Sequence, residues 1–152
     1  MKTIEINGIE YPTYATVEEA DDYFNASFGA SWEEINDYDK EKLLISATRS
    51  IDKGEYRGQK VEESQLLEFP RIINGKETSE TILMKACCEE AQAIYDKGTS
   101  ATADIDGVKR VEVQDTAIEF KDSSETSEFV SDVTDDLLRP YRYLGVSVLY
   151  WE

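Results

Sequence analysis

Hydrophobic and polar positions alternate in the first residues of the chain and recur with helical spacing further on. Two short alternating runs flank Asn7-Gly8, a dipeptide that accepts the positive φ angles of a type I′ turn. They predict a β-hairpin over residues 1–12. Apolar residues spaced by three and four positions then predict four helices, which cover residues 17–27, 39–53, 79–97 and 133–139.

The expected helix ends rest on capping residues. Thr16 and Glu19 have the spacing of a capping box, and Asp39 can cap the second helix. Gly54 and Gly98 are expected to stop the second and third helices, because glycine readily adopts the left-handed conformation at a helix end. Between Gly54 and the third helix the pattern predicts mostly irregular structure.

The last third of the chain has a different character. Residues 107–120 alternate around Gln114-Asp115 and predict a second hairpin, whereas residues 121–132 are acidic and rich in serine. Residues 142–152 are strongly β-prone and aromatic. This segment either forms a final strand within the domain or extends as an arm that docks on a partner. The arm would use the side chains of Tyr143, Val146, Val148, Tyr150 and Trp151.

Taken together, the pattern predicts a mainly α fold. We expect a small bundle of four to five helices with one or two β-hairpins and an extended C-terminal arm. The 152 residues suffice for one domain with a single core. Its expected parts are a hairpin over residues 1–12, a helical domain over 13–141 with the inserted hairpin at 107–120, and the arm at 142–152.

Charge and missing residue types narrow the function. The net charge is −17, so the protein repels nucleic acids and anionic membranes at long range. Histidine is absent, which removes catalytic triads and the common zinc sites. Neither a signal peptide nor a membrane-spanning run is expected, and the adjacent Cys87 and Cys88 are expected in the core of a cytoplasmic protein. We therefore expect no enzyme, no catalytic residues, no metal and no cofactor.

Local positive charge occurs at few places in the sequence, and the stretch that begins at Tyr56 is one of them. Arg57, Lys60 and Arg71 lie near Tyr56 and form a basic aromatic patch. Such a patch can hold phosphates and stack bases. The surrounding acidic residues favour the other interpretation, in which these side chains form ion pairs, either within the chain or at a subunit interface.

Four sequence pieces stand in an order that resembles the bacteriophage head-tail connector, or neck adaptor, proteins, which also carry the label DnaT-like single-stranded-DNA-binding proteins. The resemblance spans residues 13–141. The pieces are Thr13 to Phe24, Ala47 to Asp52 followed by Tyr56-Arg57-Gly58, Leu67 to Arg71, and Leu137 to Tyr141.

The resemblance implies a structural virion protein without catalysis. Such a protein would be assembled in the host cytoplasm and lie in the neck of the virion, as a homo-oligomeric, twelve-fold ring between the portal protein and the tail or stopper proteins. An acidic channel would let double-stranded DNA pass without tight binding, because like charges repel. The alternative is a single-stranded-DNA-binding replication module, in which Arg57, Lys60 and Arg71 would contact nucleic acid.

Overall fold

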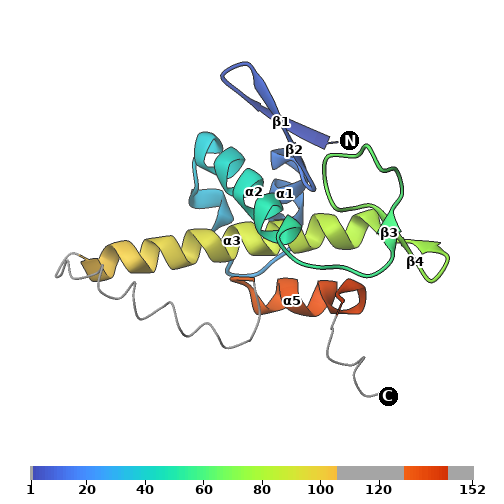
Figure 1. Cartoon of the computed structure of the whole chain (residues 1–152). Helices are drawn as coiled ribbons and strands as arrows, with labels where there is room; N and C mark the ends of the chain where they lie inside the picture. The colour runs from blue at the N-terminus through green and yellow to red at the C-terminus, as the bar shows by residue number, and fades with distance from the viewer. Residues whose placement is uncertain (1, 106–128, 144–152) are drawn as a thin grey trace.

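A computed structural model describes residues 2–105 and 129–143 of the chain (Figure 1). Its longest element is helix α3, Glu80–Ile105. Helices α1, Val17–Asn25, and α2, Asp37–Asp52, pack on one side of α3, and the short helix α5, Asp132–Leu138, packs on the other side. Two single 3₁₀ turns complete the helical part, η1 at Trp32–Glu34 and η3 at Arg139–Tyr141.

The N-terminal hairpin is confirmed. Strands β1, Lys2–Ile6, and β2, Ile9–Thr13, pair in antiparallel register, with Ile6 opposite Ile9. Asn7 and Gly8 have φ angles of 54° and 82°, as a type I′ turn requires. The hairpin packs on the body through Ile4, which is buried among the core residues.

The prediction of a mainly α bundle was wrong, because the described residues form a mixed α/β fold with four helices and two small sheets. The second sheet lies in the section expected to be irregular. It contains β3, Gln59–Lys60, β4, Arg71–Ile73, and β5, Lys76–Glu77, in the antiparallel order β3-β4-β5. Strands of two or three residues are too short to display an alternating pattern. The turn between β4 and β5, Asn74-Gly75, has positive φ angles like those of Asn7-Gly8.

Three helix details also differ from the sequence prediction. Helix α3 continues through Gly98 to Ile105, so the cost of a glycine inside a helix, about 1 kcal/mol, does not end it. Asn36 caps α2, and the expected cap Asp39 instead donates its backbone N–H to the Asn36 side chain at 2.8 Å. Helix α1 ends at Asn25, two residues before the predicted end, and Phe28 beyond it is fully exposed.

The core forms where α1 and α2 meet α3. Trp32, Leu44, Ile51 and Leu138 are fully buried, and Cys87 and Cys88 are buried beside them. A cluster of aromatic rings extends this core toward the second sheet, with Phe69 in contact with Tyr14, Tyr56 and Tyr141. The hairpin expected at residues 107–120, and all of the expected arm beyond Tyr143, lie outside the described residues.

A buried carboxylate holds α5 against α3. Glu90 of α3 is fully buried, and its two carboxylate oxygens accept the backbone N–H groups of Val130 at 2.9 Å and Ser131 at 3.0 Å. Ser131 in turn caps α5 through its hydroxyl. One acidic side chain therefore fixes where α5 begins.

The first prediction concerns this carboxylate. Replacing Glu90 by Gln leaves one oxygen for two N–H groups, so we expect the free energy of unfolding to fall by about 2–3 kcal/mol. Urea unfolding monitored by circular dichroism measures the loss. The matched control is Glu80→Gln on the exposed first turn of α3, which should change stability by less than about 0.5 kcal/mol. Equal effects of the two substitutions would contradict the role of Glu90.

The second prediction concerns Gly58, which precedes β3. A Cβ atom at this position would lie 2.0 Å from the carbonyl oxygen of Ile72, and the φ angle of Gly58 is +71°. We expect Gly58→Ala to separate β3 from β4 and to cost on the order of 3 kcal/mol. Gly75→Ala is the control, since Gly75 also has a positive φ angle but no atom within 4 Å of the added Cβ. It should cost about 1 kcal/mol, and equal losses in urea unfolding would refute the steric argument.

Candidate functional site

The structure brings the three cations singled out in the sequence close together around the second sheet. Lys60 of β3 lies opposite Arg71 of β4 in the sheet register. Arg57 is separated from the start of β3 by one residue, Gly58. Arg71 is buried, whereas Arg57 and Lys60 are half-buried.

The guanidinium group of Arg71 is used entirely within the chain. It donates to the carbonyl oxygens of Arg57 at 2.8 Å and Gly58 at 2.9 Å, and to the carboxylate of Glu68 at 2.7 Å. A buried arginine that loses such partners leaves carbonyl groups unsatisfied. Arg71 therefore holds the segment before β3 in place against β4.

Arg57 joins the same segment to the C-terminal part of the chain. Its side chain donates to the carbonyl oxygen of Pro140 at 2.9 Å, and its backbone N–H donates to that of Tyr141 at 2.8 Å. Tyr143, the described residue of the proposed arm, donates its backbone N–H to Glu55 at 2.9 Å and is half exposed. A role of Arg57, Lys60 and Arg71 at a subunit interface, or of the arm in docking, stays a prediction.

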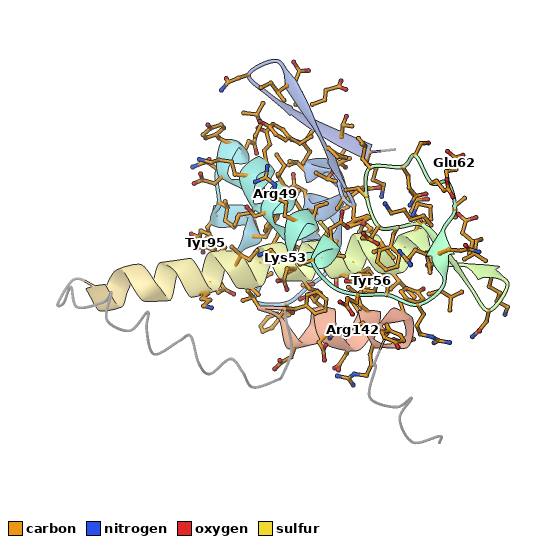
Figure 2. The ribbon with its side chains drawn as sticks, in the orientation of Figure 1. Arg49, Lys53, Tyr56, Glu62, Tyr95 and Arg142 are labelled. Carbon is orange, nitrogen blue, oxygen red and sulfur yellow. The ribbon has the colours of Figure 1, made fainter. Side chains whose placement is uncertain are left out.

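Another group of cations, which the sequence analysis did not single out, lies on α2. Tyr38, Lys42, Ser46 and Arg49 are exposed on α2, and Lys53 is exposed where the helix ends. At 100° per residue these five positions fall within an arc of about 80°, opposite the buried side of the helix. Figure 2 shows Arg49 on α2, where it lies in the last turn, and Lys53 at the carboxyl end of the helix. We call this surface, together with Tyr11 of β2, the α2 basic face.

Two tyrosine rings accompany these cations. The Nζ atom of Lys42 lies 4.7 Å from the ring centroid of Tyr38, and the guanidinium carbon of Arg49 lies 6.0 Å from that of Tyr11. Both are within the range of cation–π attraction. Tyr38 is 52% exposed. The α2 basic face thus presents two pairs, each made of one ring and one cation.

The cations of this face are not neutralised by neighbours. In residues 2–105 and 129–143, no carboxylate lies within ion-pair distance of Lys42, Arg49 or Lys53. Lys40, only two positions from Lys42, points about 200° away and pairs with Asp21 at 2.9 Å. The α2 basic face is therefore a positive surface on an acidic protein.

The carboxyl end of α2 is held by buried polar contacts. Asp52 accepts a hydrogen bond from the hydroxyl of Tyr14 at 2.5 Å and one from the backbone N–H of Glu68 at 3.3 Å. Burial of Asp52 raises the pKa of its carboxyl group above the usual range, although both hydrogen bonds act in the opposite direction. These contacts fix the backbone that carries Lys53.

A cavity of about 280 Å³ lies elsewhere, between the hairpin, the loop that carries Leu67 and Phe69, and the first turn of α3. Within the described ranges, no three acidic or cysteine side chains are grouped so that they could hold a metal ion. None of the described helices is both long and apolar enough to cross a membrane.

The signal for this face was present in the sequence. Tyr38, Lys42, Arg49 and Lys53 are separated by four, seven and four residues, which is the spacing of one helix side. The apolar positions of the same helix predict its buried side, and the cations occupy the opposite side, for which no role was predicted. Tyr11 could not be assigned to the face, because its contact with Arg49 joins the hairpin to α2 across 38 positions of the chain.

Comparison with known proteins gives one match. Residues 8–148 match the protein family described as "Putative DnaT-like ssDNA binding protein". No curated protein and no solved structure matches the chain. Since the matched residues include nearly the whole chain and all of the described helices, this protein belongs to the DnaT-like ssDNA-binding family.

Proposed function

We propose that this protein binds single-stranded DNA without catalysing a reaction, and that the strand lies along the α2 basic face. One observation carries the proposal. Lys42, Arg49 and Lys53 form a row of exposed cations beside two tyrosine rings, and no carboxylate of the described residues pairs with them, although the net charge of the protein is −17. Cations that follow a backbone, combined with rings on which bases stack, are the usual elements of single-strand binding. The family description supports the same function.

The net charge of −17 does not exclude such contacts. At physiological salt, electrostatic interactions between exposed charges fade over about 8 Å. The row from Lys42 to Lys53 spans eleven residues of helix, or about 16 Å. Phosphates lying on that row therefore interact mainly with its three cations. The many distant carboxylates chiefly slow the approach of the strand at low salt.

The length of the row sets a site size. A stacked strand rises about 3.4 Å per nucleotide along its axis, so 16 Å corresponds to about five nucleotides, and to fewer when the strand is extended. This value is at the low end of the site sizes of about 4–16 nucleotides seen for single-strand-binding domains. We therefore expect a short binding site with modest affinity for single-stranded DNA.

The third prediction tests this role. Replacing Lys42, Arg49 and Lys53 by Gln should reduce affinity for a labelled oligothymidine by about 10²-fold near 0.1 M salt. The slope of log affinity against log salt concentration should become less steep by about 2, since each phosphate contact on a single strand contributes about 0.7. Fluorescence anisotropy at several salt concentrations measures both quantities.

The matched control removes three other exposed cations. Lys76, Lys85 and Lys97 are exposed outside the α2 basic face, and replacing them by Gln changes the net charge by the same amount. This control should retain the affinity and the salt slope of the unmodified protein. If both triple variants weaken binding equally, total charge rather than the α2 basic face governs the interaction, and the proposed location is wrong.

A second candidate function is the head-tail connector, in which the chain forms a twelve-fold ring between the portal and the tail or stopper proteins in the virion neck. The observation that favours it is the excess of 33 acidic over 16 basic residues. Such a surface lining a channel would repel passing double-stranded DNA. The two candidate functions depend on different surfaces. Single-strand binding depends on the α2 basic face, whereas a connector ring depends on contacts between subunits.

The fourth prediction addresses this second candidate. Removing residues 144–152 leaves the hydrogen bond from Tyr143 to Glu55 in place, so the helices should stay folded by circular dichroism. If the removed segment is a docking arm, attachment to portal-bearing heads should be lost in electron microscopy, whereas the triple variant at Lys42, Arg49 and Lys53 should still attach. A truncated chain that no longer folds would contradict the docking arm, because the segment would then belong to the core.

A further inference from the structure

The α2 basic face is built from two ring–cation pairs rather than from scattered charges. Lys42 is four residues after Tyr38, so the two side chains lie on the same side of α2 and meet at 4.7 Å. Arg49 reaches across to β2 and meets the ring of Tyr11 at 6.0 Å. In both cases the cation lies next to a ring whose residue is not buried.

From this geometry we infer that each ring–cation pair takes one nucleotide, with the base stacked on the tyrosine ring and the adjoining phosphate on the cation. This inference rests on the proposed single-strand binding and specifies its ligand as a strand with unpaired bases, rather than any polyanion. The base can stack on the part of the ring that is accessible to solvent, and Tyr38 is 52% exposed beside its cation. The cation is then already positioned beside the base, where the phosphate must lie.

The pairing also explains how so acidic a protein can hold a strand. Three phosphate contacts alone give binding that weakens steeply with salt. Stacking of a base on an aromatic ring contributes independently of charge, and its alanine substitution weakens binding by about 5-fold to 10²-fold per base. Two stacked bases would therefore retain the strand at salt concentrations that weaken the phosphate contacts.

A ligand that stacks on both rings must have unpaired bases, so a duplex is not the preferred ligand. Lys42 and Arg49 are seven residues apart, which places the two pairs about 10 Å apart along α2. Stacking on both rings requires bases that have left their partners, since the faces of paired bases inside a duplex are covered by neighbouring pairs. A duplex could contact the three cations but not the rings.

The experiment compares two probes of equal length and charge: an oligothymidine of twelve nucleotides and a twelve-unit abasic oligonucleotide that has the same phosphates without bases. The unmodified protein should bind the base-bearing probe at least 10-fold more tightly. Tyr38→Leu should remove about 5-fold or more of that difference while leaving the affinity for the abasic probe unchanged. Tyr38→Phe, which keeps the ring, should behave as the unmodified protein does.

Two further variants keep the test decisive. Tyr11 is half-buried and packs against the core, so Tyr11→Leu is used to keep its bulk, with circular dichroism to verify the fold. Phe28→Leu removes a fully exposed ring outside the α2 basic face and should leave both affinities unchanged. Loss of preference in both Tyr38→Leu and Tyr11→Leu, but not in Phe28→Leu, would support the two-pair site.

The outcomes separate the inference from the proposed function. One outcome is that the unmodified protein binds both probes with equal affinity and the Lys42, Arg49 and Lys53 triple variant loses this binding. That result would overturn the ring–cation inference and leave binding to phosphates intact. Preference for the base-bearing probe that survives both tyrosine substitutions would also overturn the inference. Absence of measurable binding to either probe would overturn the proposed function and the inference with it.

Discussion

Burial of one side of α2 against α3 determines the direction of every other side chain on α2. Leu44 and Ile51 are fully buried at this contact, and Thr48 between them is held by hydrogen bonds to the carbonyl oxygen of Leu44 and the backbone N–H of Tyr14. A helix is rigid, so a fixed inner side implies a fixed outer one. Because the apolar side of α2 is buried, Lys42 and Arg49 on the opposite side face solvent.

The parts of the fold with local signals were predictable from the sequence. Thr16 and Glu19 form the expected capping box, and Asn7-Gly8 forms the expected turn. The second sheet was not predictable, because its three strands have at most three residues each and depend on a distant contact, the buried guanidinium of Arg71. The exposed side of α2 was within reach of sequence reasoning, whereas the approach of Tyr11 to Arg49 required the tertiary structure.

Basic residues have two distinct uses in this acidic chain. Lys40 and Arg71 are buried and paired, and they hold elements together; burial of such charges is costly unless partners are present. Lys42 and Arg49 are exposed, and their partners among the described residues are aromatic rings. The net charge of a protein therefore says little about its binding surface when a few cations on one side of a helix have no acidic partner. An estimate from net charge alone makes the affinity of such a surface for anions too low.

The clamp formed by Glu90 has a consequence for the part of the chain that precedes α5. Since the start of α5 is set by hydrogen bonds to α3, its place in the fold does not depend on the path of the chain between residues 105 and 129. Lengthening a connection costs little free energy, because the entropy of closing a loop grows only slowly with its length. An insertion into this connection is therefore expected to leave α5 in the same place against α3.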